Sequence, residues 1–463
     1  MPSTASPTFK LFLAGLIAVL LVIPLLMVYG LISDRQAQAR VAQDSIVEGM
    51  GGPQTVTGPM LMVPYVRTEQ ISETIDGQFV TRQARTRDAL YLHPVRQRTA
   101  TTLSPERKRI GIYENVVYAA KVEGTARFEF PGDLARYGTV RENLLLDEAQ
   151  LRFGVADMRG FRTPAEVRAG GRPIMLEPGQ GSGATGGSGF HGFVEWNGQA
   201  PLDVSYAYAL NGSRAFSFVP RGGQSDWTVR SSWAHPGFAG AFLPDARTVG
   251  DDGFEAEWSV GNLALGQSVV SRTDMGPIAG SDTMPPPARE VAMGEAPEAP
   301  ASLAATITLI DPADVYSKVD RAVKYGFLFI GFTFLAYLMF DLIGRAQVAT
   351  AEYMLTGVGL VLFFVLLLAF AEVVPFALAY VLASGAIIGL LTAYSAAVLA
   401  SWRRAWFMGG LLVALYATLY ILLSLEQFAL LVGALLLFAA LAATMYATRR
   451  IDWIEWQREQ VEE

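Results

Sequence analysis

The chain has 463 residues, of which 51% are hydrophobic and 17% are charged, and the apolar excess is concentrated toward its two ends. This distribution indicates a membrane protein with a large water-soluble part. The formal net charge of -7 offers no basic surface for nucleic acid, so we expect no nucleic-acid partner. With no cysteine and three histidines, disulfides, thiolate zinc sites and iron-sulfur clusters are excluded, and we expect no metal and no cofactor.

The first apolar segment, residues 11–33, carries no charge between Lys10 and Asp34. A helix of this length crosses the hydrocarbon core of a bilayer at about 1.5 Å per residue. Ala37-Gln38-Ala39 resembles a signal-peptidase site, but the apolar segment is longer than the usual core of a signal peptide. We therefore predict that residues 1–33 form an uncleaved N-terminal transmembrane anchor.

A second apolar region covers residues 321–448 and is interrupted only by short charged groups. Each apolar interval is close to one bilayer width, which predicts five helices near residues 322–342, 352–371, 374–399, 405–424 and 427–448. Cationic loops tend to stay in the cytoplasm, so the N-terminus and the C-terminal tail, residues 449–463, are expected there. The expected inner-face anchors are Lys10, Arg345, Arg403, Arg404, Arg449 and Arg450.

Three glutamates interrupt or border these segments: Glu352, Glu372 and Glu426. An acid inside a bilayer often marks a proton or ion path. Glu426 is the sole charged residue between Ala405 and Thr448, but the predicted topology places it, like Glu372, in a short outer turn where its carboxylate reaches water. Glu352 is expected at the inner boundary. We interpret all three as boundary residues and keep a proton relay as the alternative.

The long segment between the two membrane regions, residues 34–320, is expected on the outer side of the membrane. Residues 32–50 are expected to extend the first helix as far as Gly51-Gly52-Pro53. Beyond that point apolar and polar residues alternate and are broken by Gly and Pro, which predicts antiparallel strands. The expected fold class is therefore a six-helix membrane part, one helix N-terminal and five C-terminal, with a large β-rich, mostly antiparallel domain.

Two stretches of this domain are predicted to be flexible loops. Residues 178–193 contain Gly181, Gly183 and Gly186 in the G-x-G-x-x-G spacing of pyrophosphate-binding loops, but no helical pattern follows them. We interpret this stretch as a glycine-rich loop and not as a nucleotide site. Residues 281–302 are rich in Pro, Ala and Glu, as solvated insertions are.

Catalytic patterns are missing from the sequence. His93, His191 and His235 are isolated, and no H-E-x-x-H, G-x-S-x-G or S-x-x-K motif is present. Two of these histidines precede proline, which is typical of a turn, so all three are interpreted as structural. The pair Asp251-Asp252 would serve glycoside chemistry only across a cleft, which sequence does not show. We expect the protein not to be an enzyme.

Several stretches, in this order and with this topology, together resemble the CreD family of bacterial inner-membrane proteins. They are GGPQTVTGPMLMVPY, RKRIGIYENVVYAAKVEGTARF, VRSSWAHPGFAGAFLP followed by GFEAEW, DPADVYSKVDRAVKYGFLFIGFTFLAY and YATRRIDW. The resemblance implies an inner-membrane location, a periplasmic β-rich domain, and a role in envelope integrity, colicin tolerance and a β-lactam stress response. It implies no catalytic residues. Val373 stands where the family is expected to have a histidine, which weakens a proton-transfer role at that place.

One matched stretch combines aromatic, turn and close-packing residues: Trp233, His235, Pro236, Phe238, Gly240 and Pro244. We interpret this motif as maintaining the fold. The alternative is a recognition surface, since aromatic residues are enriched in binding sites.

Two classes of function remain. The favoured one is a non-enzymatic envelope protein whose periplasmic domain binds a periplasmic protein or a cell-wall component, while its helices contact membrane lipids. It predicts that alanine at Glu352, Glu372 and Glu426 leaves function intact. The alternative is a transporter or flippase-like protein that moves a lipid or small molecule through the C-terminal bundle. It predicts that alanine at these three glutamates impairs function. The span interiors hold few polar groups, which disfavours transport.

Overall fold

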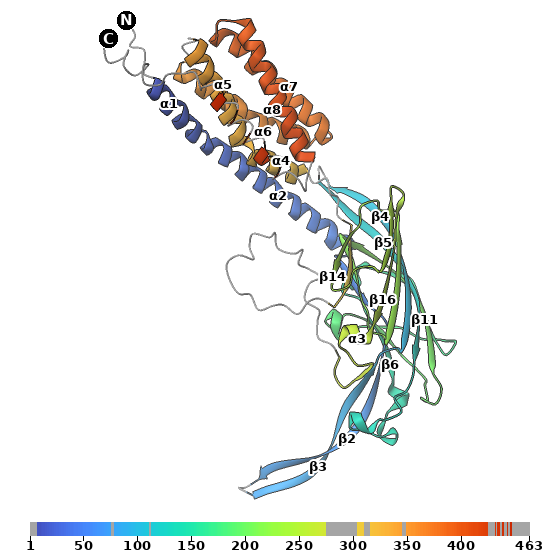
Figure 1. The fold of residues 1–463 in the computed structure, drawn as a ribbon. Helices are drawn as coiled ribbons and strands as arrows, with labels where there is room; N and C mark the ends of the chain where they lie inside the picture. The colour runs from blue at the N-terminus through green and yellow to red at the C-terminus, as the bar shows by residue number, and fades with distance from the viewer. Residues whose placement is uncertain are drawn as a thin grey trace. The chain divides into compact units, whose positions relative to one another are not determined.

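The computed structural model describes residues 7–75, 78–110, 113–274, 303–309, 315–344 and 349–424, with scattered helical positions from 431 to 446. The chain divides into two compact units. The helical unit combines Met1–Arg40 with Ala313–Glu463, and the β unit is Val41–Pro312. Figure 1 shows the helices of the first unit and the strands of the second. Each unit has a large hydrophobic core of its own.

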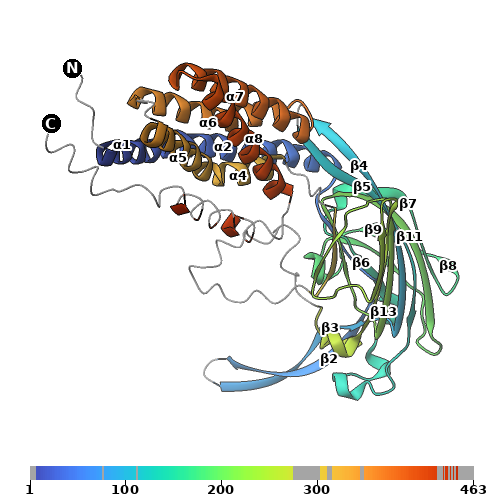
Figure 2. The same cartoon turned by 45° about the horizontal axis from the view of Figure 1, so that its top comes forward.

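The helical unit is built from long helices (Figure 2). They pack around a buried aromatic and aliphatic core. Among the described residues, four helices are long and apolar enough to cross a membrane, or up to five if the pair α4–α5, bent by 41°, is one span. The helices are α1 (Pro7–Leu20), α2 (Val22–Met50), α4 (Val315–Lys324), α5 (Gly326–Gly344), α6 (Thr350–Ala371), α7 (Phe376–Val398) and α8 (Trp402–Ser424).

The predicted spans at 352–371, 374–399 and 405–424 correspond to α6, α7 and α8, and the first helix does continue to Met50. The predicted span at 427–448 lies largely outside the described residues. The expected total of six membrane-spanning helices therefore stays a prediction.

The two compact units meet at Arg40/Val41 and Pro312/Ala313. These limits do not mark the membrane boundaries, so the domain boundaries expected at 34 and 320 stay predictions. Helix α4 belongs to the helical unit. Its apolar stripe, with Val319 and Val323 buried, packs in the helical unit, but its charged residues give the segment a low hydropathy that reads as part of a soluble domain.

In the described ranges the β unit forms three sheets. An eight-stranded sheet has the order β15-β16-β13-β4-β5-β11-β7-β8. Its strands are β4 (Arg96–Ile110), β5 (Tyr113–Phe128), β7 (Phe161–Ala169), β8 (Arg172–Pro173), β11 (Leu202–Ser213), β13 (Gln224–Ser231), β15 (Ala246–Gly250) and β16 (Gly253–Gly261). Neighbouring strands are antiparallel except β4 and β13, which are parallel.

The six-stranded sheet has the order β17-β3-β2-β6-β10-β9, and the four-stranded sheet the order β1-β12-β18-β14. The first comprises β2 (Met60–Ile75), β3 (Gln78–Leu92), β6 (Gln150–Gly154), β9 (Glu177–Pro178), β10 (Gly189–Phe193) and β17 (Val270–Ser271). The second comprises β1 (Gln54–Thr57), β12 (Ala215–Val219), β14 (Gly237–Gly240) and β18 (Ala305–Thr308), and a short helix, α3 (Asn262–Leu265), follows β16. The expectation of a β-rich, mostly antiparallel domain is confirmed.

Period-two alternation explains how the strands form the core. In β11, Leu202, Val204 and Tyr206 are buried, whereas Asp203 and Ser205 between them are exposed. Trp227 of β13 and Trp258 of β16 stack inside with ring centroids 4.4 Å apart. The opposite face of the eight-stranded sheet is left polar and open.

The predicted flexible loop at 178–193 is wrong, because this stretch is an ordered connection. It contains a 3-10 turn, Gly183–Thr185, and strand β10, which pairs with β6. Gly186 and Gly187 adopt positive φ angles of 65° and 80°, so the glycines serve a tight turn and not mobility. The other predicted loop, 281–302, lies outside the described residues.

Candidate functional site

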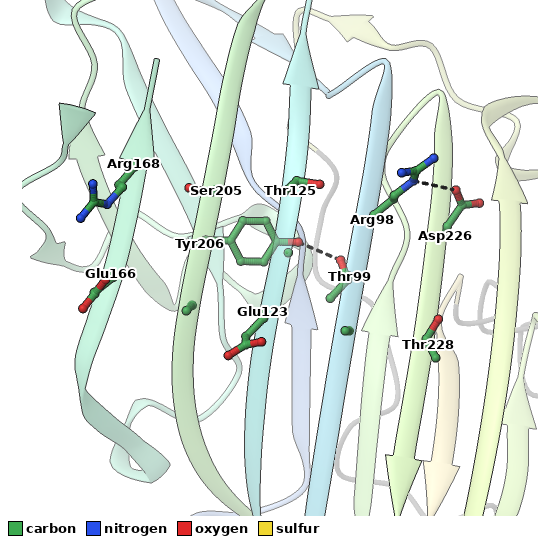
Figure 3. Close-up of a pocket in the computed structure, with 13 residues that line it drawn as sticks. Arg98, Thr99, Glu123, Thr125, Glu166, Arg168, Ser205, Tyr206, Asp226 and Thr228 are labelled. Carbon is green, nitrogen blue, oxygen red and sulfur yellow. Dashed lines mark hydrogen bonds and ion pairs between the residues drawn. The ribbon is translucent and has the colours of Figure 1, made fainter. Parts of the chain in front are cut away.

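An open depression of about 650 Å³ lies on the outer, polar face of the eight-stranded sheet (Figure 3). Strands β4, β5, β7, β11 and β13 contribute to it. Its lining residues are Arg98, Thr99, Ala100, Glu123, Gly124, Thr125, Glu166, Arg168, Ser205, Tyr206, Ala207, Asp226 and Thr228.

Strand register aligns the outward side chains into two rows that cross these five strands. The row that we call the arginine row consists of Arg168, Ser205, Thr125, Arg98 and Asp226, each opposite the next. The row that we call the glutamate row lies two residues further along each strand and consists of Glu166, Ala207, Glu123, Ala100 and Thr228. Figure 3 shows the two rows above and below the ring of Tyr206.

Small side chains make the depression possible. Ser205 and Ala207 of β11 lie between β7 and the central strand β5, and Ala100 lies on β4, and none of them fills the space between the charged side chains around them. The result is a shallow hollow lined by both hydroxyl groups and charged side chains.

Beneath the hollow, Gly124 permits a tyrosine to lie across the sheet on its buried side. A Cβ atom at Gly124 would overlap the hydroxyl of Tyr206. The Tyr206 Oη lies 2.8 Å from Thr99 Oγ1, and Gln97 Nε2 donates to the same Oη at 3.3 Å. Burial raises the pKa of Tyr206 to about 12, although these hydrogen bonds lower it in part. The phenol therefore stays protonated and supports the floor of the site; it is not a base.

The charges of the depression are only partly paired. Arg98 Nε and Asp226 Oδ2 are 3.9 Å apart on the exposed face, and Lys121 is paired with Glu123. Glu166 and Arg168, by contrast, form no ion pair with another described residue. Both side chains are exposed and available to a ligand.

The motif expected to maintain the fold or form a recognition surface lies elsewhere, where the chain leaves the eight-stranded sheet after β13, enters the four-stranded sheet as β14 and returns as β15. Phe238 of β14 is paired with Ile307 of β18, and its ring lies 5.8 Å from that of Phe254. The Trp233 indole N–H donates to the carbonyl of His235 at 3.1 Å, and the Arg107 guanidinium lies 5.6 Å from the Trp233 ring centroid.

The remaining motif residues lie on the same connection between β13 and β15. His235 is exposed, Pro236 and Pro244 are half-buried, and Gly240 ends β14 with a φ of 92°. The motif therefore connects the eight-stranded sheet with the four-stranded sheet, and it is separate from the depression. The fold-maintaining interpretation remains a prediction, which a substitution at Gly240 can test.

Two membrane glutamates have local partners. Glu352 Oε2 accepts a hydrogen bond from the backbone N–H of Ala349 at 2.7 Å, at the start of α6. Glu372 Oε1, at the end of α6, lies 3.5 Å from Arg35 Nε of α2. Glu426 lies outside the described residues.

The expected topology anchors are described only in part. Arg403 and Arg404 lie in the first turn of α8, beside the exposed Trp402 and Trp406. Arg449 and Arg450 lie outside the described residues.

The three histidines lie in separate environments. His93 is buried, and burial together with the charge of Arg221 lowers its pKa to about 3. His191 is buried as well, and its Nδ1 lies 3.0 Å from the carbonyl oxygen of Gly179. Within the described ranges no group of three or more His, Asp or Glu side chains is placed to hold a metal.

Sequence reasoning did not find the depression. Alternation along β4, β5 and β11 marks which residues point outward, but the rows exist only because strands distant in sequence pair in one register. Arg98 and Asp226, for example, become neighbours through the parallel pairing of β4 with β13.

Together, the apolar helices and the β unit define a membrane protein with a large β-rich, mostly antiparallel part. The family model for "Inner membrane protein CreD" matches residues 6–454. The inner membrane protein CreD of Escherichia coli (strain K12) is 30% identical over 445 residues, covering 94% of this chain and 91% of that protein. The chain therefore belongs to the CreD family of inner membrane proteins, as the sequence motifs predicted.

Proposed function

We propose that this protein contributes to cell envelope integrity and envelope or β-lactam stress tolerance as a non-enzymatic binding protein. In this proposal the β unit lies in the periplasm and binds a periplasmic protein or a cell-wall component through the depression on its eight-stranded sheet. The observation that carries the proposal is the open hollow, in which the exposed side chains of Glu166 and Arg168 form no ion pair with another described residue.

The chemistry of the hollow supports binding more than catalysis. The phenol of Tyr206, which burial holds protonated, does not act as a general base there. Exposed charges and hydroxyls on a rigid sheet instead suit recognition of a polar ligand, because the strands fix their spacing.

The proposed orientation rests on the distribution of basic residues. Arg403 and Arg404 at the start of α8 would lie at the cytoplasmic face, together with the N- and C-termini. The β unit would then be connected through α2 and α4 on the periplasmic side.

A transporter remains the second candidate, and one observation favours it. Hydroxyl groups gather inside the helical unit, where Tyr337 of α5 is hydrogen-bonded to Ser395 of α7. The buried hydroxyls of Thr333 and Thr356 have no hydrogen-bond partner among the described residues. Polar groups inside a bundle are often part of a substrate path.

In-cell photocrosslinking separates the two candidates. A photoreactive residue at Ala207, in the depression, is expected to capture a reproducible partner under β-lactam stress, identified by mass spectrometry. The matched control is Leu263 of α3, which is 92% exposed and not part of the depression. Capture at Thr356 with none at Ala207 would favour the transporter.

A further inference from the structure

We propose that the depression binds a short zwitterionic peptide, with the peptide carboxylate at the arginine row and its ammonium group at the glutamate row. This inference rests on the proposed function, in which the same face is the binding surface, and it adds the chemical class of the ligand.

The two rows of the depression differ in the sign of their charges. The row that contains Arg168 and Arg98 has two cations and one acid, Asp226, whereas the row that contains Glu166 and Glu123 has acids and no cation. Two parallel lines of opposite sign make a surface dipole across the hollow. A ligand with one positive and one negative end satisfies both lines, while a simple anion meets the glutamates and a simple cation meets the arginines.

Glu166 and Arg168 are the two residues of the rows whose charges form no ion pair with another described residue. These residues are two positions apart on β7, so their side chains leave the same face of the strand. Several other charges on the face are paired, as Arg230 is with Glu255 at 2.7 Å. The charges of Glu166 and Arg168 thus remain available for a ligand at the edge of the hollow.

Spacing sets the size of the ligand. Two residues along a strand correspond to roughly 6.7 Å, which exceeds the separation of ammonium and carboxylate in a single amino acid but matches an extended dipeptide. The longest opposite-charge diagonal, from Arg98 on β4 to Glu166 on β7, crosses three strand spacings and is about 16 Å. An extended peptide of about five residues reaches that far. The hollow therefore fits peptides of about two to five residues.

The chemistry between the two rows suits a peptide backbone. Ser205 and Thr125 present hydroxyl groups that both donate and accept hydrogen bonds, which is what amide N–H and C=O groups require. Ala207 and Ala100 leave room for the backbone above the sheet.

The test is a ligand-observed NMR titration of the full-length protein in nanodiscs with trialanine and its end-capped forms. We expect N-acetylation or C-amidation alone to weaken binding about fivefold each, the effect of losing one exposed charge pair. Arg168→Gln is expected to abolish the effect of C-amidation and leave that of N-acetylation, and Glu166→Gln to do the opposite. Lys108→Gln, which removes an exposed charge paired with Glu106 outside the hollow, serves as the control and should change neither.

The outcomes separate this inference from the proposed function. Equal binding of free and doubly capped trialanine, or tighter binding of phosphoethanolamine than of any peptide, would overturn the zwitterionic peptide. If Ala207 still captures a partner in cells, the proposed function stands and only the ligand class is wrong. If Ala207 captures nothing and trialanine does not bind, both fail.

Discussion

His93 is a buried histidine whose neighbour Arg221 comes from a distant part of the chain. Sequence reasoning classed it as structural from the following proline, but the Arg221 contact depends on the tertiary fold. Its folded pKa of about 3 lies below the ordinary value of 6.5, so the unfolded chain binds a proton that the folded chain does not. Stability should therefore be full above pH 6.5 and fall as the pH drops toward 3.

The expected slope from this residue is up to about 1.4 kcal/mol per pH unit within that window. His93→Leu should flatten the pH dependence of the melting temperature of the β unit, followed by tryptophan fluorescence of the full-length protein. His235, which is exposed, provides the matched control, and His235→Leu should leave the slope unchanged. An unaltered slope in His93→Leu would contradict this account.

Gly240 gives a second prediction at the residue scale, and it tests the fold-maintaining interpretation of the motif. Its φ of 92° is unfavourable for other residues, and a Cβ atom there would overlap the carbonyl oxygen of Ala304. Gly240→Ala should destabilise the β unit by about 1–3 kcal/mol. Gly250→Ala, where a Cβ atom meets nothing, should be tolerated in the same melting assay. Equal stability of the two variants would favour the recognition alternative.

At the scale of elements, α2 and α6 are connected by the ion pair between Arg35 and Glu372. Sequence reasoning placed Glu372 in a turn where it reaches water, whereas its side chain is only 16% exposed. A double-mutant cycle with Arg35→Ala and Glu372→Ala should give a coupling energy of about 0.5–1 kcal/mol in thermal unfolding in detergent. Additive effects would mean that the pair contributes nothing.

Hydropathy located α6, α7 and α8 well, because an uninterrupted apolar run of bilayer length is typical of a membrane-spanning helix. It gave little signal for α4, a short charged helix with one apolar stripe. Alternation predicted the strands, but not the glycine turn at 183–189, since glycine serves both flexible loops and tight turns. The depression was beyond sequence reasoning, because its rows require the register of five strands.

At the scale of the whole molecule, the orientation in the membrane can be tested because the chain has no cysteine of its own. A single cysteine at Leu263, on the β unit, should react with a membrane-impermeant maleimide in spheroplasts. A single cysteine at Trp402, which is 63% exposed at the start of α8, should react only after the inner membrane is permeabilised. The opposite pattern would reverse the proposed topology.

The most direct measurement is complementation of a strain that lacks this protein, scored by survival under envelope stress and β-lactam exposure. The account predicts that the paired charge reversal Glu166→Arg with Arg168→Glu, at normal protein levels, abolishes rescue. It also predicts that glutamine at Glu352, Glu372 and Glu426 leaves rescue intact. Loss of rescue from the membrane glutamates, with full rescue by the charge-reversed sheet, would place the function in the helical unit and contradict the account.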